Sequence, residues 1–301
     1  MKKTVIAVVV THNRLNYLKR CLNYIEIQER KVDQILVINN ASTDGTYNYL
    51  KTKKNVYVIN QKNLGSAGGW YTGIKFAKQN YFDYIWMMDD DGFPDTKSLK
   101  ILVDKITNKH SCISSIVVNE EIRNLLVFPM PKINYFGNPI IFSLFRKIKK
   151  LDTLNYKYPN FYNYAHLFNG ALISLDAVKK IGNINKDFVL YGDEVDYFYR
   201  LKKVGKVESC TLAYHYHPDI SKRKISKNAA YYYLRNSIFL NFKYFDNPHL
   251  RSLLNFFVLI FRLFYRNGFF QTMIFVLSIK KNIFIASIYD AYSNRLGKID
   301  K

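Results

Sequence analysis

Hydrophobic and polar positions in the first part of the chain fall into blocks that predict strands and helices in alternation. Short runs of apolar, β-branched residues indicate buried strands at residues 4–11, 34–39, 56–60, 83–88 and 111–118. Helical spacing or helix-start signals indicate helices between them, at residues 15–27, 42–52, 70–80 and 96–106. Because such alternation is typical of a parallel sheet with helices on both faces, we expect an α/β fold with a mostly parallel sheet.

The pattern changes in the second half of the chain. Residues 119–165 contain four prolines and many aromatic residues, and we interpret them as an irregular insertion near the ligand-binding site. Regular patterns return as a strand, a helix and a strand-like segment at residues 167–175, 191–205 and 207–217. From Ser221 onward the chain is helical, aromatic and basic. We therefore expect a first domain of residues 1–220 and a helical C-terminal extension of residues 221–301.

Charge and cysteine usage limit the possible partners and compartment. The 301 residues carry 45 Lys and Arg against 23 Asp and Glu, a net charge of +22 that predicts an anionic partner. Nucleic acid, a phosphorylated substrate and anionic lipid all qualify. The three cysteines are widely spaced, with no disulfide framework or zinc pattern, which fits a reducing compartment. The N-terminal apolar run is short and no small-residue cleavage site follows it, which favours a first strand over a signal peptide.

Three consecutive carboxylates, Asp89, Asp90 and Asp91, follow the predicted strand at residues 83–88. Ligands of open parallel sheets bind beyond the carboxyl ends of the strands, where these residues fall. One aspartate could cap the next helix, but capping does not explain three, because adjacent like charges repel. A hard divalent cation, Mg²⁺ or Mn²⁺, would relieve the repulsion and would bridge to substrate phosphates.

Three further segments carry candidate chemistry. The glycine-rich "NLGSAGGW" (63–70) opens a helix and permits close approach of an anion, although it is neither a dinucleotide fingerprint nor a P-loop and such glycines can form only a turn. The acids of "GDEVD" (192–196) suit the first turn of a helix, or one of them serves as a general base. His215 and His217 lie on one strand face, where they are structural or one of them binds the metal.

Taken together and in this order, the motifs resemble those of family 2 glycosyltransferases of the GT-A fold, which has a Rossmann-like sheet. The resemblance covers about residues 4–220 and rests on "VVVTHNR", "VINNASTDGT", "NLGSAGGW", "WMMDDDG", "FNGALIS", "YGDEVDYFYRLKKVG" and the later H-x-H. It implies an inverting transferase that uses a nucleotide-activated sugar and a divalent metal, Mn²⁺ or Mg²⁺. The pairing of "NLGSAGGW" with "WMMDDDG" looks most like bacterial galactofuranosyltransferases, with rhamnosyltransferases nearby.

For the partners, the resemblance implies UDP-galactofuranose as donor and a glycan, or a glycan linked to a lipid diphosphate, as acceptor. Such a reaction would belong to bacterial surface polysaccharide synthesis, for example of capsule or O-antigen. Matching the family's motifs position by position implies that these residues bind the nucleotide and the sugar: Thr11, Asn13, Arg14, Asn39, Asn63, Gly68, Gly69, Trp70, Asp89 and Asp90. Asn39 stands where many relatives have an aspartate, so it keeps hydrogen-bonding capacity but lacks the charge.

The same matching implies the metal ligands and the base. Asp89 and Asp91 correspond to the outer members of the D-x-D metal motif. His215 matches the family's metal-ligand histidine better than His217 does. The second acid of "GDEVD", Glu194, corresponds to the general base that accepts a proton from the acceptor hydroxyl. Because many relatives have an aspartate there, Asp193 stays open as the alternative base.

Residues 222–301 combine positive charge with apolar stretches. They contain 14 Lys and Arg against 3 Asp and Glu, and Arg262, Arg266 and the pair Lys280-Lys281 interrupt or end the apolar runs. No run reaches the ~20 residues of a transmembrane helix. Either these helices form a protein core, or they lie on an anionic membrane surface. On the second interpretation, which we favour, the protein is cytoplasmic and peripheral at the inner face of the plasma membrane. Anionic headgroups would then be bound by Arg251, Arg262, Arg266, Lys280 and Lys281. The side chains that insert into the membrane would be Leu253, Phe256, Phe257, Leu259, Ile260 and Phe264.

Four alternative functions remain to be compared. A nucleotidyltransferase also uses metal carboxylates on such a sheet, but it would lack the arrangement from "GDEVD" to H-x-H. The net charge and the many aromatic residues suggest a nucleic-acid binder, but the acidic cluster would repel phosphates without its ion and the basic residues gather in an apolar tail. A rhamnosyl- or other hexosyltransferase fits the same motifs. An inactive glycosyltransferase-like assembly subunit would not need the acidic motifs, which are all intact.

Overall fold

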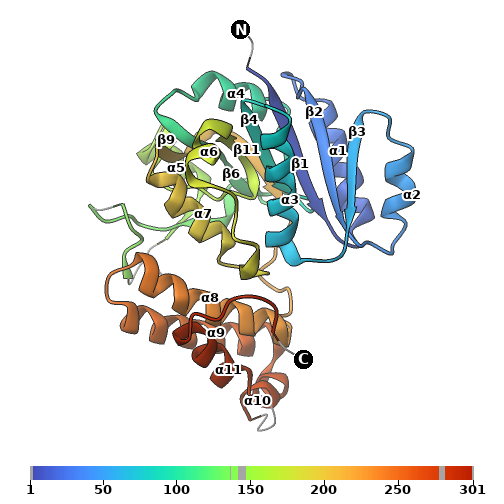
Figure 1. Cartoon of the computed structure of the whole chain (residues 1–301). Helices are drawn as coiled ribbons and strands as arrows, with labels where there is room; N and C mark the ends of the chain where they lie inside the picture. The colour runs from blue at the N-terminus through green and yellow to red at the C-terminus, as the bar shows by residue number, and fades with distance from the viewer. Residues whose placement is uncertain (1–2, 136, 142–146, 278–281, 300–301) are drawn as a thin grey trace.

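The computed structural model describes residues 3–135, 137–141, 147–277 and 282–299. A large sheet flanked by helices forms the upper part of the molecule in Figure 1, and a group of C-terminal helices lies beneath the lower edge of that sheet. This arrangement confirms the predicted α/β fold with a helical C-terminal extension.

The sheet is mostly parallel. Its order is β3-β2-β1-β4-β10-β6-β11-β5, and the first four are parallel: β1 (Val5–Thr11), β2 (Gln34–Asn40), β3 (Val56–Gln61) and β4 (Tyr84–Asp89). β10 (Asn169–Ser174) runs antiparallel between β4 and β6 (His110–Asn119). β11 (Lys206–His217) is parallel to β6, and the short β5 (Phe93–Pro94) pairs antiparallel with β11. As predicted, the carboxyl ends of β1, β2 and β4 meet at one edge.

Helices cover both faces of this sheet, which explains why its strands read as continuous apolar runs. Ile6, Val8 and Val10 of β1 pack into the core on one face, and the intervening residues pack into the core on the other. The first core includes α3 (Gly65–Gln79), α6 (Leu175–Ile181) and α7 (Asp193–Lys202). The second includes α1 (Leu15–Glu26), α2 (Thr46–Lys51) and α4 (Ser98–Lys105).

Two parts of the fold differ from the prediction. The helix predicted at residues 70–80 begins at Gly65, so the glycines form its first turns instead of a preceding loop. The insertion at 119–165 is more regular than expected: it contains β7 (Leu125–Met130), β8 (Ile148–Lys150), α5 (Leu151–Lys157) and β9 (Phe161–Tyr162). These elements extend the sheet from β6 and β11 and share a small core with them, which proline content alone did not reveal.

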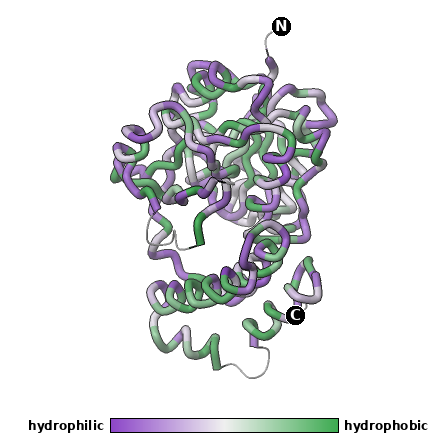
Figure 2. The backbone as a smooth tube through the Cα atoms, turned by 90° about the vertical axis from the view of Figure 1, so that its left-hand side faces the viewer, coloured by the Kyte–Doolittle hydropathy of each residue, from purple (hydrophilic) through white to green (hydrophobic). Residues whose placement is uncertain are grey.

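The C-terminal region consists of α8 (Lys227–Tyr244), α9 (Pro248–Asn267), α10 (Phe269–Leu277) and α11 (Ile283–Tyr292). They have a hydrophobic core of their own, and green hydrophobic segments run through them in Figure 2. No helix within the described ranges has the length and hydropathy needed to cross a bilayer.

Close packing of α3 on β1 gives a testable prediction. An alanine in place of glycine usually stabilises a helix by up to about 1 kcal/mol. A Cβ at Gly69, however, would lie 2.5 Å from Val10 Cγ1. We therefore expect Gly69→Ala to lower the free energy of unfolding by about 1–3 kcal/mol, as overpacking does. Chemical denaturation measures this, with Lys75→Ala on the exposed face of the same helix as control. Unchanged or raised stability of Gly69→Ala would contradict the packing.

Candidate active site

The three aspartates lie where β4 leaves the sheet, and side chains of the first strand and the following loop neutralise them. Asp90 and Asp91 are buried, and Asp89 is half-buried. Thr11 donates its hydroxyl to Asp90 Oδ2 at 2.7 Å. The Arg14 guanidinium lies 3.0 Å from Asp90 Oδ1 and 2.7 Å from Asp91 Oδ2. The sequence placed these five residues at two neighbouring strand ends, and the structure brings them into contact.

Asp91 is the most strongly paired of the three. Its Oδ1 lies 3.1 Å from His217 Nε2, and its Oδ2 lies 3.2 Å from Arg223 as well as beside Arg14. Burial opposes its ionisation, but the hydrogen bond from His217 and the nearby positive charges outweigh burial and hold the pKa of Asp91 well below its usual range. Asp91 is therefore a permanent negative charge in the site.

Asp89 and Asp90 have the opposite tendency. Burial, and then the charges of Asp91 and Asp90, raise the pKa of Asp89 well above its usual value. Burial also raises the pKa of Asp90, although Arg14 and Thr11 partly compensate. The Asp89 carboxylate makes no side-chain hydrogen bond within the described residues, so its charge is the least satisfied of the three.

The structure gives the two histidines different surroundings, and metal binding by His215 stays a prediction. His217, not His215, contacts Asp91. His215 is fully buried on β11, where a Cβ at Gly92 would lie 2.2 Å from its Nε2. Neither of its ring nitrogens has a hydrogen-bond partner in the described structure, and burial lowers its pKa to about 3. The sequence could not separate the two, because alternate residues of a strand face the same side.

Asn13 and Asn39, two of the predicted nucleotide-binding residues, hold the loop after β2. Asn13 Oδ1 accepts from the Thr43 amide at 2.6 Å, and Asn39 Oδ1 accepts from the Ser42 amide at 3.1 Å. The Asn39 amide group donates to Asn60 at 2.8 Å. Their contact with a nucleotide stays a prediction, and the observed bonds show how the loop is shaped.

The glycine-rich segment divides into a buried part and an exposed part. Gly68, Gly69 and Trp70 are buried between α3 and the sheet, and Trp70 stacks on Phe168 with ring centroids 4.8 Å apart. Asn63 is exposed and caps the turn by accepting from the Gly65 amide at 3.0 Å. The tight glycines thus explain helix packing, and a donor contact by Gly68, Gly69 or Trp70 stays a prediction.

A cavity of about 950 Å³ opens beside the acidic cluster, a volume that suits a small-molecule ligand. On the side of the large sheet, its wall includes Thr11, His12, Arg14, Asn63, Asp89 and Asp90. The C-terminal region supplies the other side, including Lys227, Tyr232, Asp290 and Lys298. Lys298 also donates to the Asn63 backbone oxygen at 3.1 Å, so the two parts of the chain close around one cleft.

The candidate base lies at the start of α7. Asp193 is buried, its Oδ2 has no hydrogen-bond partner among the described residues, and burial and then the charge of Glu194 raise its pKa to about 7. Glu194 is more open: its side chain is 32% exposed, and its Oε1 accepts from the Leu167 amide at 2.6 Å and lies 3.6 Å from His166 Nδ1. The third acid, Asp196, is structural, because Arg200, Lys243 and Tyr244 all bind it.

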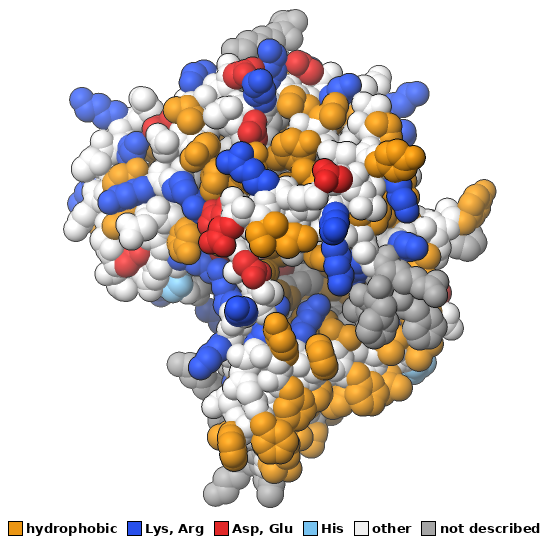
Figure 3. All heavy atoms as spheres, turned by 180° about the vertical axis from the view of Figure 1, so that it is seen from behind, with side chains coloured by type: hydrophobic (Ala, Val, Ile, Leu, Met, Phe, Trp, Pro, Cys, Tyr) orange, Lys and Arg blue, Asp and Glu red, His pale blue; other side chains and the backbone are white. Residues whose placement is uncertain are grey.

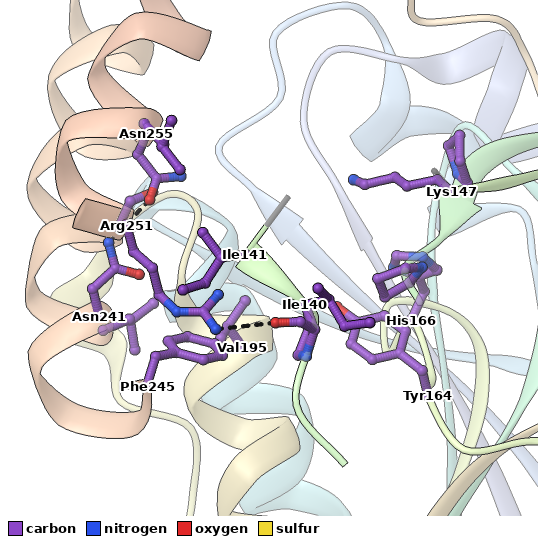
Figure 4. Close-up of a pocket in the computed structure, with 16 residues that line it drawn as sticks. Ile140, Ile141, Lys147, Tyr164, His166, Val195, Asn241, Phe245, Arg251 and Asn255 are labelled. Atoms are coloured by element: carbon purple, nitrogen blue, oxygen red, sulfur yellow. Dashed lines mark hydrogen bonds between the residues drawn. The ribbon is translucent and has the colours of Figure 1, made fainter. Parts of the chain in front are cut away.

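A second, smaller cavity of about 270 Å³ lies between the insertion and the C-terminal helices, and His166 borders it (Figure 4). Lys147 and Tyr164 line it from the insertion side, while Arg251 and Asn255 come from α9. Arg251 donates to the Pro139 backbone oxygen at 3.1 Å, which ties α9 to the insertion. His166 thus lies between this cavity and Glu194.

The sequence analysis missed several residues that surround the site. His166 and Arg223 contact the predicted acids, and Lys227 and Lys298 line the cleft. Only the H-x-H pattern offered a signal for His217. The others lie far along the chain from the acidic triplet, in segments without a motif of their own, so only the folded chain identifies them.

The raised pKa of Asp193 predicts a pH-dependent stability. The unfolded chain releases this proton near pH 4, but the folded chain keeps it until about pH 7, so ionisation of Asp193 destabilises the fold increasingly across that window. Asp193→Asn removes the ionisation. We expect the variant to be more stable than wild type at pH 8 by up to about 4 kcal/mol, with a smaller gain at pH 5.

Denaturant unfolding at both pH values, in the presence of a chelator, measures this difference. Asp176→Asn, at an aspartate whose side chain is 80% exposed, is the matched control and should show no such trend. Equal effects of Asp193→Asn at pH 5 and pH 8 would rule out the raised pKa.

Comparison with known proteins identifies the family and agrees with the fold. The sequence profile of Glycosyl transferase family 2 matches residues 6–172. Galactofuranosyltransferase GlfT1 of Mycolicibacterium smegmatis is 32% identical over 223 residues, which cover 72% of this chain and 71% of that protein. Its counterpart from Mycobacterium tuberculosis is 28% identical over 225 residues, with the same coverage of both chains.

Solved structures show the same fold at low sequence identity. Residues 1–349 of Staphylococcus aureus TarS superpose with a TM-score of 0.54 and 15% identity, covering 97% of this chain and 78% of that one. The mannosyltransferase PcManGT from Pyrobaculum calidifontis, in complex with GDP-Man and Mn²⁺, gives a TM-score of 0.52 and 13% identity, covering 98% and 87%. The family match and the GlfT1 identity confirm the predicted resemblance: this chain belongs to glycosyltransferase family 2 and has a GT-A fold.

Proposed function

We propose that the protein is an inverting glycosyltransferase that moves galactofuranose from UDP-galactofuranose to a hydroxyl of a glycan or lipid-linked glycan, in bacterial surface polysaccharide synthesis such as that of capsule or O-antigen. The observation that carries the proposal is the juxtaposition of the acidic triplet Asp89–Asp91 with a large cleft, with carboxyl groups at the start of α7 nearby. The choice of donor sugar is supported by the identity to GlfT1. Rhamnose or another hexose is the alternative, because TarS binds UDP-GlcNAc and PcManGT binds GDP-Man on the same fold.

Positive charge around the cleft suits a nucleotide diphosphate. Arg14, Lys227 and Lys298 line the cleft from three parts of the chain. Cations placed where negative charge grows on the leaving group lower the barrier to its departure. Asn63 and the loop held by Asn13 and Asn39 would bind the sugar and the nucleoside.

The acidic triplet supplies oxygen donors that suit a divalent cation, although no three His, Cys, Asp or Glu side chains among the described residues are already placed to hold a metal ion. Asp89 has an unsatisfied carboxylate, and Asp91 and His217 place an oxygen and a nitrogen 3.1 Å apart. Carboxylate oxygens suit Mg²⁺ and Mn²⁺, and Mn²⁺ also accepts imidazole. We assign Asp89, Asp91 and His217 as the ligands, with His217 in place of the predicted His215. A metal ion bound there would supply positive charge to the departing diphosphate.

Glu194 is our choice of general base. Its carboxylate is half-buried and more open than that of Asp193, and the Leu167 amide holds one of its oxygens in place. The acceptor hydroxyl gives its proton to Glu194, and its oxygen forms a bond to the anomeric carbon while the bond to the nucleotide diphosphate breaks. Attack from the face opposite the leaving group inverts the anomeric configuration, through a transition state of oxocarbenium character. Asp193 remains the alternative base, because its raised pKa of about 7 also suits proton transfer.

The test is transfer by the purified protein from a panel of nucleotide sugars headed by UDP-galactofuranose. We expect nucleotide release and an acceptor product with Mn²⁺ or Mg²⁺, and none with excess chelator. Glu194→Gln keeps the side-chain shape but cannot accept a proton, so kcat should fall by at least ~10²-fold while donor binding is largely kept. Asp91→Ala should abolish transfer and weaken donor binding.

Glu121→Gln, at an exposed glutamate in the insertion, is the control and should retain wild-type activity. Full activity in chelator would remove the metal from the proposal. An active Glu194→Gln together with an inactive Asp193→Asn would exchange the two roles. Failure of the wild type to release nucleotide from any donor would favour an inactive assembly subunit.

We also propose that the C-terminal helices dock on an anionic membrane surface at the cytoplasmic face of the plasma membrane. Hydrophobic side chains gather over these helices at the bottom of Figure 3. Among the described residues of these helices, the most exposed are Leu253, Phe257, Phe261, Tyr265, Phe269, Phe270, Ile274, Leu277, Ile285, Tyr289 and Tyr292. The basic excess of residues 222–301 complements anionic headgroups.

The structure changes which residues can make that contact. Of the predicted inserting residues, Leu259 is buried and Phe256 and Ile260 are partly buried in the C-terminal core. Arg251, predicted to bind headgroups, is paired with Asp246 at 2.7 Å. Lys280 and Lys281 lie outside the described residues. The docking face is therefore better tested through exposed aromatic residues than through these side chains.

For that test we choose the double variant Phe261→Glu with Phe270→Glu, at side chains that are 72% and 84% exposed. Wild type should co-sediment with vesicles of phosphatidylglycerol and phosphatidylcholine and be released in part by salt. The double variant should stay in solution yet still glycosylate a soluble acceptor, because the cleft is untouched. Tyr156→Glu, at a tyrosine that is 90% exposed on α5, is the matched control. Absence of vesicle binding by wild type would exclude the membrane.

A further inference from the structure

The loop that leads into the catalytic acids has an unusual backbone. After a 3₁₀ turn at Lys186–Phe188, Val189 and Tyr191 have φ values of 66° and 61°, and Gly192 has 80°. The left-handed region is costly for residues other than glycine, above all for a β-branched one. Such conformations persist only where surrounding contacts impose them. Since Asp193 and Glu194 follow directly, this loop sets where their carboxylates lie.

Asn236, a buried residue of α8, makes the contacts that impose this shape. Its Nδ2 lies within hydrogen-bond distance of three backbone oxygens of the loop, at 3.1 Å from Phe188 O, 3.0 Å from Leu190 O and 2.8 Å from Tyr191 O, so its two N–H groups are shared among these three acceptors. A Cβ at Gly192 would lie 2.9 Å from Asn236 Cβ, so α8 and the loop pack without a gap. One amide group from the C-terminal region thus serves three carbonyls of the catalytic domain.

Arg235 fixes the orientation of that amide. It is buried like Asn236, and its Nε donates to Asn236 Oδ1 at 2.8 Å, which leaves the Asn236 Nδ2 facing the carbonyls. Its other nitrogens donate to Asp187 O and Phe188 O, both at 3.3 Å, and to Gly297 O at 2.7 Å. The pair therefore joins the loop, α8 and the end of the chain in one buried network.

The same loop also touches the donor cleft. Val189 O accepts from the Ala67 amide at 3.4 Å, and a Cβ on Gly65 would lie 2.1 Å from that oxygen. Val189 and Gly65 both line the large cavity. A displacement of the loop would thus move the catalytic acids relative to the first turn of α3.

We propose that Asn236, oriented by Arg235, is a positioning residue of the C-terminal region that holds the 187–192 loop and thereby fixes where the acids at the start of α7 lie relative to the cleft. This inference rests on the proposed function for its catalytic consequence. A misplacement of about 1 Å in a reacting group can cost on the order of 10²-fold in rate, so a side chain that touches no substrate can control turnover.

Asn236→Asp tests the proposal with the least change of shape. The substituted oxygen is an acceptor and faces three backbone carbonyls that cannot reorient, so the loop should be released. We expect amide hydrogen exchange of residues 187–193 to accelerate and kcat to fall by about 10- to 100-fold, with a much smaller change in UDP affinity. Protonation of the introduced carboxyl restores one donor, so the ratio of variant to wild-type kcat should rise as the pH is lowered.

Asn241→Asp is the matched control on the same helix. Asn241 is also buried, but its amide donates to Ser252 Oγ at 3.1 Å and Asn255 Oδ1 at 3.0 Å, side chains that can rotate to serve a carboxylate. It should leave exchange in the loop and kcat near wild type. If Asn236→Asp unfolds the protein, Asn236→Ser, which keeps a single donor, replaces it in the same comparison.

The two readouts separate the possible failures. Unchanged exchange in the loop, or an equal loss of kcat in Asn241→Asp, would overturn the positioning role. Accelerated exchange with unchanged kcat would also overturn it, because the loop would then not control the acids. If the wild type transfers no sugar from any donor, the proposed function fails, while hydrogen exchange still decides whether Asn236 holds the loop.

Discussion

Electrostatic repulsion among three adjacent carboxylates is the constraint on which the rest of this site depends. Asp89, Asp90 and Asp91 leave a buried strand together, where loss of hydration and mutual repulsion both oppose their ionisation. Four groups stabilise Asp90 and Asp91. They are the Thr11 hydroxyl and the Arg14 guanidinium from β1 and its loop, the His217 imidazole from β11, and the Arg223 guanidinium from the segment before α8. Because these groups come from opposite ends of the sequence, the triplet can be accommodated only once the whole chain has folded.

That arrangement prepares the site electrostatically. Asp91 stays ionised because its cationic neighbours are fixed, whereas Asp89 keeps an unsatisfied charge toward the cleft. Groups held in this way need little reorganisation when charge moves during a reaction. The cost of gathering like charges in a buried place is thus concentrated beside the cleft where we propose that the donor diphosphate binds.

The C-terminal region contributes side chains to the cleft and to the loop before α7, in addition to forming part of the molecular surface. Its helices bury Arg235 and Asn236, and a buried charge is tolerable only where hydrogen bonds satisfy it. The partners that satisfy it are backbone carbonyls of the catalytic domain, so the polar pair fixes how α8 docks. Lys227 and Lys298 reach the cleft from the same region, and the opposite face of these helices is rich in exposed aromatic residues.

The strand ends were predictable from sequence because local patterning determines them. β1, β2 and β4 are buried on both faces and read as apolar runs, and the polar residues after them meet at one sheet edge whatever the loops do. The acidic triplet was identified in this way, and the acids of "GDEVD" were identified from the start of a helix. The regular elements of the insertion were not predicted, because β7 and β9 are strands through pairing with β6, β8 and β11.

The sequence by itself thus determined the α/β architecture, the family and the acids that stand at the strand and helix ends, since these follow from periodicity and ordered motifs. Tertiary structure alone decided that His217 contacts Asp91 while His215 is enclosed, that Gly69 and Trp70 pack inside the helix–sheet interface, and that Asn236 holds the loop before Glu194. The physical reason is the same in each case. Side chains on one strand face or one helix turn follow the same periodic pattern in the sequence. Only their contacts with groups far along the chain distinguish one from another.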